Sequence, residues 1–489
     1  MPRDFSKAEH TIILSDVHLA EAEPPRPGKP LWKRFKRAKY FIDRSFDRFL
    51  KDIQEKADGS IELILNGDIL DFDSVMVQPK DPSFNVSWLE RVRGLSATED
   101  KSAFKANVIL NDHPVFFNAL REFLMNGHRL IYIIGNHDIE VHWGKVKQAI
   151  LDRLDLPKEH QDSVRFCEWF YVSNGDTVIE HGNQYDAYCL CHDPIHPLVK
   201  KRNEDYVRVP FGNMAGKYML NGMGMMNPHV DSSFIKSSFK EYFVFFYKYV
   251  VRYEPFLLLK WFWSALVTGA LSIAEGLLPP LRDPLTVEHR VRSIAHRANT
   301  STEKVRSLRT LHVHPAIFNP WKILQELWLD RALLLIFIVF ASFQFFTFIN
   351  FFIQVSLWWF LVPVFLFFPV FLFYARSVSS EILQTERNLV RNAAMVGKIT
   401  NIDRVIMGHT HREFQTHVGE IEFVNTGTWS PAFEDPECTK RYGATCFAWL
   451  KPGKNGSRTC ALYEWKDPGY ELIEPEIYKF GPKKVVRQS

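Results

Sequence analysis

The sequence predicts a layered α/β domain that is interrupted by an apolar helical segment. Short runs rich in Ile, Val or Leu end in Gly, Asn, Asp or His at five places along the chain. Amphipathic helical patterns lie between such runs, and one stretch of 44 residues contains no charged side chain. The first two observations indicate alternating strands and helices, and the third indicates membrane-spanning helices.

The five apolar runs are typical of buried strands that end in loops, because each is short and is stopped by polar residues or Gly. They are TIILSDVH (11–18), IELILNGD (61–68), LIYIIGNHD (130–138), TVIEHGN (177–183) and VIMGHTH (405–411). The C-terminal part adds strand-like runs at 421–429, 443–450 and 458–465. We therefore expect strands at both ends of the chain.

Helical patterns separate these runs in the first part of the chain. Within residues 40–56, the apolar positions include Phe46, Phe49 and Ile53, which fall on one face of a helix. Residues 114–127 repeat this spacing, and Gly127 is expected to end that helix. Because strands and helices alternate, we expect them to form an α/β layered domain.

The uncharged stretch covers residues 332–375. At ~1.5 Å per residue, a helix of this length would reach roughly 66 Å, about two hydrocarbon thicknesses. Asn350 and Gln354 mark a turn near its middle, and Arg331 and Arg376 flank it. We predict a transmembrane helical hairpin. The alternative is a pair of helices buried in a soluble core.

A second apolar segment, residues 255–274, is also long enough to span a membrane. It contains Lys260 and has charges close on both sides, so we interpret it as an interfacial or shallow helix. These features divide the chain into four predicted parts. They are the N-terminal half of the α/β domain (1–200), a helical insertion with the interfacial segment (201–330), the transmembrane hairpin (331–376) and the C-terminal half of the α/β domain (377–489).

Composition narrows the class of protein and its compartment. The formal net charge is only +4, which is not typical of a nucleic-acid-binding protein. Six cysteines in 489 residues are sparse and unpatterned, so we expect reduced thiols. The first residues, MPRDFSKAEH, are polar, and the apolar run after them is too short for a signal-peptide core. The α/β domain is therefore expected at the cytoplasmic face of the inner or plasma membrane.

Seven side chains at the ends of the predicted strands are candidate metal ligands. They are Asp16, His18, Asp68, Asn136, His181, His409 and His411. Carboxylate and amide oxygens mixed with imidazoles suit Mn²⁺, Fe²⁺ or Zn²⁺ better than Ca²⁺. Seven ligands are too many for one such ion, but they suit two ions that share a bridging carboxylate.

The order of these motifs resembles the calcineurin-like metallophosphoesterase superfamily. The motifs are SDVH (15–18), NGDILD (66–71), GNHD (135–138), HG (181–182) and GHTH (408–411). Each motif alone is common, but all five occur in order, each after an apolar run. The resemblance covers residues 11–186 and roughly 400–430. It implies a four-layer αββα sandwich and two divalent metal ions, with Mn²⁺ the first expectation and Fe, Zn or Mg as alternatives.

The resemblance also implies a role for each position. Asp16, His18 and His411 would bind the first metal. Asn136, His181 and His409 would bind the second, and Asp68 would bridge the two. His137 would contact the phosphoryl oxygens and protonate the leaving group, with Asp71 to orient it. From the residues alone, Asp71 could instead cap a turn, and Asp138 could equally support a ligand or cap a turn.

The implied function is a membrane-associated two-metal phosphohydrolase, in which a metal-bridging hydroxide attacks a phosphoester or pyrophosphate bond. The early motifs are similar to the UDP-2,3-diacylglucosamine hydrolase branch, but His137 stands where that branch commonly has Arg. A lipid-linked or amphiphilic phosphate is the expected substrate, membrane lipids are expected partners, and nucleic acid is not. The alternatives are a phosphodiesterase or nuclease acting on soluble nucleotides or nucleic acid, and a non-catalytic membrane-tethered scaffold.

The spacing of two candidate ligands restricts the membrane topology. His181 and His409 are expected on the same ion, yet 228 positions separate them, and every apolar segment lies between them. Both must be in one compartment, so the number of membrane crossings between them must be even. Two spans within 332–375 satisfy this condition, whereas a third span at 255–274 would break it.

Overall fold

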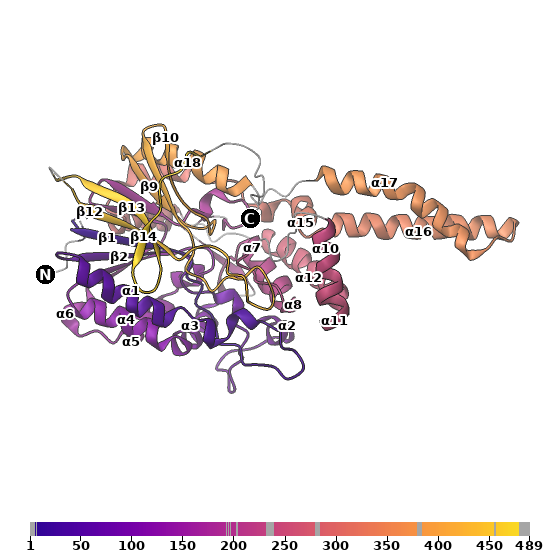
Figure 1. Ribbon diagram of the computed structural model, residues 1–489, viewed down its shortest axis with the longest axis horizontal. Helices are drawn as coiled ribbons and strands as arrows, with labels where there is room; N and C mark the ends of the chain where they lie inside the picture. Colours follow the sequence, from indigo (N-terminus) through magenta and orange to yellow (C-terminus); the bar gives the residue numbers. More distant parts are fainter. Residues whose placement is uncertain are drawn as a thin grey trace.

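The computed structural model describes residues 5, 7–191, 193, 195, 197–201, 204–230, 239–278, 284–378, 384–453 and 456–478. Its centre consists of two β-sheets that contain both parallel and antiparallel strands, with helices around them (Figure 1). The predicted α/β class is therefore confirmed. A pair of long helices extends away from this body.

The larger sheet has seven strands. In spatial order they are β14 (Tyr470–Leu472), β13 (Arg458–Trp465), β12 (Cys446–Pro452), β1 (His10–Leu14), β2 (Ile61–Asn66), β3 (Arg129–Ile133) and β4 (Val164–Cys167). Strands β1 to β4 are parallel, and β12 joins them antiparallel to β1. Every residue of β1 and β2 is buried, which explains why these strands are almost continuously apolar in sequence.

The smaller sheet has five strands. In spatial order they are β10 (Glu413–Val418), β11 (Ile421–Thr426), β9 (Arg404–Met407), β6 (Thr177–Glu180) and β5 (Phe170–Ser173). The three central strands are parallel, and the two outer strands are antiparallel to their neighbours. The sheet thus combines strands from both ends of the chain. A separate hairpin is formed by β7 (Leu198–Lys201) and β8 (Glu204–Val207).

The two sheets pack face to face. Ile13, Ile64 and Ile131 of the larger sheet share one buried core with Ile179 and Ile406 of the smaller sheet. Because successive side chains of a strand point to opposite faces, the alternate residues of each sheet must be covered by other elements. Helices provide that cover.

Helices from the first part of the chain cover the outer face of the seven-stranded sheet. They are α1 (Asp43–Lys56), α3 (Glu99–Asp112), α4 (Pro114–Met125) and α5 (Gly144–Leu154), all of which contribute to its core. Two short helices in this part of the chain, α2 (Trp88–Arg93) and α6 (Lys158–Gln161), have no buried residues. In α1 the predicted apolar face, including Phe46, Phe49 and Ile53, is buried. Helix α4 starts with Pro114 and ends two residues before Gly127, which has a φ of 90°.

Three further helices cover the outer face of the five-stranded sheet. They are α13 (Pro284–Arg297), α14 (Thr302–Arg309) and α18 (Thr385–Thr400). Val291, Val305 and Leu389 share a buried core with Val178 and Val405 of the sheet. Two of these helices precede the long helical pair in sequence and one follows it, so this layer combines segments from both sides of that pair.

The insertion forms a helical group beside the sheets. It contains α7 (Phe211–Ala215), α8 (Asn221–Met223), α10 (Phe239–Phe245), α11 (Val251–Tyr253), α12 (Leu257–Gly276) and α15 (Pro320–Glu326), with π-helical turns at Gly216–Leu220 and Phe246–Val250. Helix α12 corresponds to the predicted interfacial segment. Its buried face includes Ser264, Thr268 and Ser272, whereas Leu259 and Trp263 are exposed.

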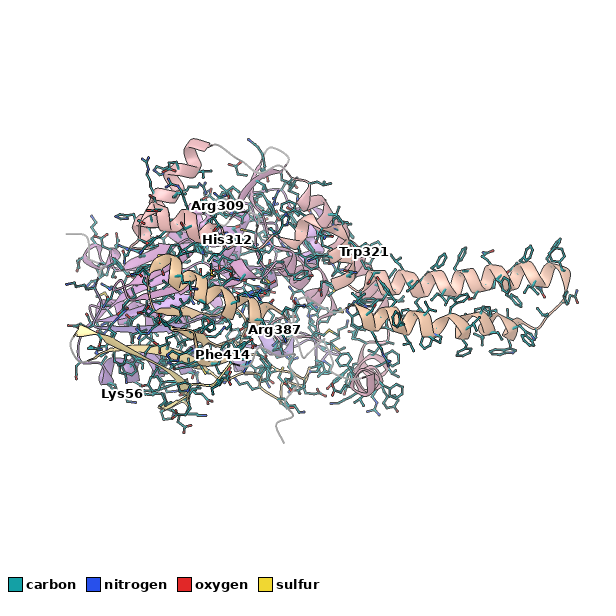
Figure 2. The ribbon with its side chains drawn as sticks, turned by 90° about the horizontal axis from the view of Figure 1, so that it is seen from above. Lys56, Arg309, His312, Trp321, Arg387 and Phe414 are labelled. Atoms are coloured by element: carbon teal, nitrogen blue, oxygen red, sulfur yellow. The ribbon has the colours of Figure 1, made fainter. Side chains whose placement is uncertain are left out.

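The long helical pair consists of α16 (Leu329–Phe352) and α17 (Leu361–Ser377). Their side chains project outward along almost the whole length of the pair (Figure 2). The guanidinium of Arg331 donates to the carbonyl of Val378 at 3.0 Å, and Tyr374 donates to Asp330 at 2.8 Å, so the two ends are adjacent. Among the described residues, α12, α16 and residues 357–377 are long and apolar enough to cross a membrane.

Candidate metal centre

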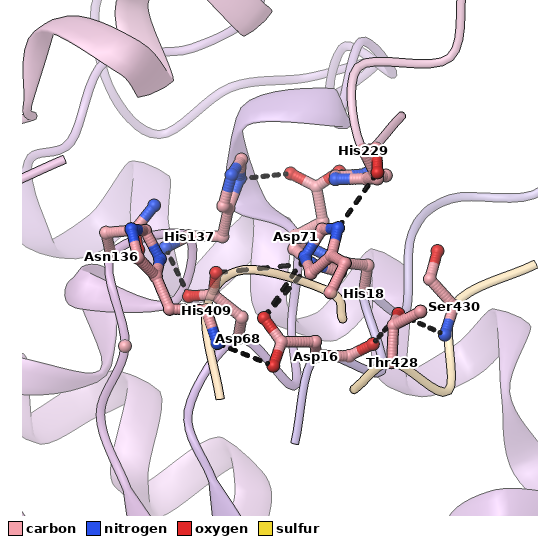
Figure 3. Close-up of polar contacts among 12 residues, drawn as sticks. Asp16, His18, Asp68, Asp71, Asn136, His137, His229, His409, Thr428 and Ser430 are labelled. Carbon is pink, nitrogen blue, oxygen red and sulfur yellow. Dashed lines mark hydrogen bonds and ion pairs between the residues drawn. The ribbon is translucent and has the colours of Figure 1, made fainter. Parts of the chain in front are cut away.

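The seven candidate ligands follow the carboxyl ends of parallel strands in both sheets. Asp16 and His18 follow β1, Asp68 follows β2, Asn136 follows β3, His181 follows β6, and His409 and His411 follow β9. The first five are buried, and the last two are half-buried. Because the two sheets pack face to face, these strand ends meet at one edge of the double layer, and Figure 3 shows the resulting group of polar side chains.

Three of these side chains form a first cluster. Nε2 of His411 lies 3.1 Å from Oδ1 of Asp16 and 3.1 Å from Nε2 of His18. One ligand atom from each residue lies within 4.8 Å of the others. Two imidazole nitrogens and a carboxylate oxygen therefore converge on one small volume, which is the geometry of a cation site.

Asp68, His181 and His409 form a second cluster with the same spacing limit. Nε2 of His181 lies 3.2 Å from Oδ2 of Asp68. The same oxygen lies 4.0 Å from Nε2 of His18 in the first cluster. Asp68 thus faces both clusters, as the bridging position requires.

Asn136 is held near the second cluster by the residue after it. The backbone N–H of His137 donates to Oδ1 of Asp68 at 2.8 Å. The amide nitrogen of Asn136 donates to Asn213 at 3.2 Å. Its amide oxygen is buried and makes no hydrogen bond to any described residue. An amide held this way leaves an oxygen lone pair available to a cation.

The backbone is strained at most of these positions. The φ angles of Asp16, His18, Asp68, His409 and His411 are 55°, 51°, 55°, 71° and 54°. Left-handed backbone costs a non-glycine residue roughly 1–3 kcal/mol, and such residues cluster at functional sites. Hydrogen bonds between the loops support the strain, for example from the N–H of His18 to the carbonyl of Asp68 at 2.9 Å.

Gly67 shows how closely the loops approach one another. Its φ is 80°, and a Cβ atom there would lie 2.5 Å from the imidazole of His181. No larger residue fits this position without displacing a candidate ligand. The glycine of the NGD motif is therefore explained by the packing of the second cluster.

Two buried side-chain atoms, one in each cluster, have no hydrogen-bond partner among the described residues, and a divalent cation at each cluster would bind them. Oδ1 of Asp16 and Nε2 of His181 are buried and make no hydrogen bond within the described part of the chain, although each lies within about 3.2 Å of a group of opposite polarity. Buried polar atoms without partners are rare and require an explanation. Cations at both clusters would satisfy them.

The electrostatics of the cluster favour cation binding. Burial opposes ionisation of Asp68, but His181 and His137 outweigh it and hold the pKa of this carboxyl well below its usual range. Burial also opposes ionisation of Asp71, but the adjacent imidazoles of His137 and His229 outweigh it and hold the pKa of this carboxyl well below its usual range. Both carboxylates are therefore anionic at neutral pH.

His137 lies between two carboxylates. Its Nδ1 is 3.4 Å from Oδ1 of Asp71 and 3.5 Å from Oδ2 of Asp73. Burial works against its charged form, but Asp68 and these two carboxylates raise the pKa of His137 well above its ordinary value. Asp71 also accepts a hydrogen bond from the N–H of Ser74 at 3.2 Å, so it both caps a turn and pairs with His137.

Asp138 acts as a local support. Its carboxylate accepts hydrogen bonds from the N–H groups of Gly135 at 2.5 Å and Ile69 at 2.9 Å, and from Tyr132 at 2.8 Å. These bonds tie the loop after β3 to the loop after β2. The Asp138 side chain does not cap the turn that follows it, so the structure favours the supporting role over the cap.

Several residues of the site carried no sequence signal that singled them out. They are Asp73, Asp186, Asn213 and His229. Oδ2 of Asp186 lies 3.1 Å from Nε2 of His409. Asn213 donates to Oδ2 of Asp73 at 2.6 Å and to the carbonyl of Asn136 at 3.0 Å. Asp186 follows His181 by five positions, but a single carboxylate near a histidine in sequence is too common to indicate a functional residue.

Comparison with models of known protein families and with curated proteins found no match to this chain.

Proposed function

We propose that the protein is a membrane-associated, two-metal phosphohydrolase of the calcineurin-like metallophosphoesterase superfamily. The observation that supports this best is the position of Asp68 between the two clusters, 3.2 Å from His181 on one side and 4.0 Å from His18 on the other. A carboxylate in this place can contribute one oxygen to each of two ions. The face-to-face sheets with helices on both outer faces also agree with the αββα sandwich of that superfamily.

Each of the two clusters would hold one ion. Asp16, His18 and His411 would hold the first ion, Asn136, His181 and His409 the second, and Asp68 both. Mn²⁺ is the first choice for this mixture of oxygen and imidazole donors, with Fe, Zn or Mg as alternatives. When bound, such a pair of ions lowers the pKa of a water between them and polarises phosphoryl oxygens.

The second part of the proposal is proton transfer by His137. Its imidazole is flanked by Asp71 and Asp73, which stabilise the protonated ring. A protonated imidazole can donate a hydrogen bond to a phosphoryl oxygen and then its proton to the departing oxygen. Asp71 would keep Nδ1 protonated and fix the orientation of the ring.

The surface supports an amphiphilic substrate. The helical pair α16–α17 exposes apolar side chains along its length, including Phe340, Phe351 and Phe373. Exposed apolar side chains continue on the insertion at Phe243, Phe246, Tyr247, Tyr253, Phe256, Leu258, Leu259 and Trp263. Aromatic and aliphatic side chains beside the exposed cations Lys248 and Arg252 suit the boundary between headgroups and acyl chains.

We propose that α16 and α17 span the membrane and that α12 lies at its surface, with the metal centre on the cytoplasmic side. The buried face of α12 is lined by Ser264, Thr268 and Ser272, so this helix is packed against protein through its polar side. Two crossings leave the ligands from β6 and β9 in one compartment. The substrate is then a phosphate or pyrophosphate carried by a lipid and presented from the bilayer.

The proposal is tested by metal analysis of the purified protein together with an activity panel. The panel contains bis-p-nitrophenyl phosphate, a soluble phosphomonoester, a nucleotide pyrophosphate, and phosphorylated and pyrophosphate-linked lipids. We expect two equivalents of divalent metal and highest activity on a lipid. Asp68→Ala should lower activity at least about 100-fold, because even residues outside the ligand shell contribute 10–100-fold. The matched control is Asp47→Ala on α1, whose carboxylate pairs with Lys51 at the surface.

Two outcomes would overturn the proposal. Activity of Asp68→Ala equal to that of the wild type would remove the catalytic assignment. A wild-type protein that binds no divalent metal at either cluster would remove the metal assignment. Preference for nucleic acid, with a steep dependence of binding on salt, would favour the nuclease alternative.

A further inference from the structure

The insertion sends one side chain into the metal centre. His229 lies six positions after Met223, the last residue of α8, and its side chain is buried. Its Nε2 lies 3.0 Å from Oδ2 of Asp71. We propose that His229 is a positioning residue of the catalytic site, through which the insertion holds Asp71, His18 and His411 in place. This inference rests on the proposed function and deepens it.

The first contact concerns Asp71. Its two carboxylate oxygens have different imidazole partners, with His137 3.4 Å from Oδ1 and His229 3.0 Å from Oδ2. The N–H of Ser74 also donates to Oδ1. A carboxylate held from both sides cannot rotate, so the position of His137 depends on His229 through Asp71. Removing the ring of His229 would leave one oxygen of a buried carboxylate without this partner.

The second contact concerns His411 and uses the backbone of His229. Nδ1 of His411 lies 2.8 Å from the carbonyl oxygen of His229. Since a carbonyl only accepts, Nδ1 carries the proton and Nε2 of the neutral ring is left as the lone-pair donor. That nitrogen is the one that faces Asp16 in the first cluster. A hydrogen bond of this kind fixes the tautomer and the orientation of a metal-binding imidazole.

The third contact concerns His18. The rings of His229 and His18 are stacked, with centroids 3.8 Å apart and an angle of 28° between their planes. The ring of His229 also meets that of His137 edge-on at 5.3 Å. His18 has left-handed backbone, so a ring stacked on its imidazole helps to keep a strained residue in one orientation.

The loop that bears His229 is itself well fixed. The N–H of His229 donates to the side-chain oxygen of Asn227 at 3.0 Å, and Val230 is fully buried. Met223 and Met225, which precede His229 in sequence, belong to a buried cluster with Tyr249 and Leu257 of the insertion. The position of His229 therefore depends on the packing of the insertion, including the start of α12.

The test separates the ring of His229 from its carbonyl. His229→Ala removes the contacts to Asp71 and His18 but keeps the carbonyl that accepts from His411. We expect kcat to fall about 10–100-fold, as for other residues that orient groups at a metal site, while KM changes little. Calorimetric titration with Mn²⁺ should still show two sites. His229→Gln, whose amide can donate to Asp71, should recover part of the lost kcat.

A positioning role also predicts coupling to His137. If His229 acts through Asp71 and His137, then His229→Ala should cause little further loss in a His137→Ala background. The loss in the otherwise wild-type protein should be larger for diphenyl phosphate than for bis-p-nitrophenyl phosphate, because the poorer leaving group depends more on the proton donor. The control is His289→Ala, which removes an exposed histidine from α13 and should change none of these values.

Each remaining outcome has a definite meaning. Wild-type kcat in His229→Ala would overturn the inference, and so would a loss that is fully additive with His137→Ala. A lowered melting temperature together with loss of both Mn²⁺ sites would show a purely structural role and would also overturn it. A wild-type protein without metal or activity would instead defeat the proposed function itself, and the two failures are thereby distinguished.

Discussion

The backbone N–H of His409 donates a hydrogen bond to Oδ2 of Asp16 at 3.0 Å, across 393 positions of sequence. This bond joins the loop after β9 to the loop after β1, so it connects the C-terminal and N-terminal parts of the α/β domain at the candidate metal centre. The insertion and the helical pair lie between these two residues in sequence, so the bond brings together the chain on either side of them. The candidate metal centre is thus also a structural junction.

The carboxylate of Asp186 should determine how firmly the second cluster holds its ion. It lies 3.1 Å from Nε2 of His409, and hydrogen bonds from His409 and the backbone N–H of Tyr188 outweigh burial and lower its pKa. An anionic partner orients a metal-binding imidazole and increases its basicity. We therefore expect Asp186→Asn to weaken metal binding at one of the two sites about 10–100-fold.

Calorimetric titration with Mn²⁺ measures this change directly. Asp193→Asn is the matched control, because its carboxylate pairs with Arg309 in the same region without facing a candidate ligand. Equal affinities for Asp186→Asn and the wild type would contradict the assignment of Asp186.

Gly135 should be essential because of its distance from the bridging carboxylate. A Cβ atom at Gly135 would lie 2.3 Å from Oδ1 of Asp68 and 2.5 Å from its backbone nitrogen, and backbone atoms cannot move aside cheaply. We expect Gly135→Ala to displace Asp68, to lower the metal content and to reduce activity at least about tenfold, as misplacement of an orienting group does. Gly216→Ala provides the comparison, since nothing lies within 4 Å of a Cβ there.

Metal content and activity are measured on both variants. Gly216→Ala should match the wild type or be slightly more stable, because Ala has the higher helix propensity. Full metal content in Gly135→Ala would show that the loops after β2 and β3 can separate without loss of the site.

The elements that the sequence predicted well are those with a local pattern. The apolar runs before Asp16, Asp68 and His181 form strands, because burial on both faces leaves a near-continuous apolar run that is readable in one sequence. The candidate ligands meet because the ends of parallel strands in two stacked sheets share one edge. Their assembly could therefore be anticipated from their places after the strands.

The residues that the sequence did not indicate depend on packing between distant segments. His229 and Asn213 belong to the insertion, and no fixed spacing relates them to Asp71 or Asn136. Their contacts arise only when the insertion packs beside the sheets. The polar buried face of α12 was not predicted either, because small polar residues such as Ser264 hardly lower the mean hydropathy of the segment.

Lys33 should make stability depend on pH. Its side chain is buried, and burial together with repulsion from Lys36 lowers the pKa of Lys33 to about 7, although Glu21 and Glu23 partly offset this. In the unfolded chain a lysine titrates near ~10.4. Between these values the unfolded chain binds more protons, so the contribution of Lys33 to the free energy of unfolding increases as pH rises from 7 to 10. The full increase is at most about 5 kcal/mol.

Lys33→Met removes this titration while keeping an apolar side chain of similar length. We expect the variant to melt at a higher temperature than the wild type at pH 7, and the difference to shrink at pH 9. Lys51→Met, at an exposed position of α1, should show no such convergence. A constant difference between Lys33→Met and the wild type at both pH values would contradict the shifted pKa.

The helical pair should be separable from the metal centre. Arg331 donates to the carbonyl of Val378 at 3.0 Å, so a short Gly/Ser linker can replace residues 332–377 without moving the chain on either side. If only α16 and α17 span the membrane, the shortened protein should be released from membranes by alkaline carbonate, whereas the full chain should require detergent. Its exposed apolar residues on α12 would still favour peripheral association. Two bound Mn²⁺ ions in the shortened protein would show that the site forms without the hairpin, and continued resistance to carbonate would show that another segment crosses the bilayer.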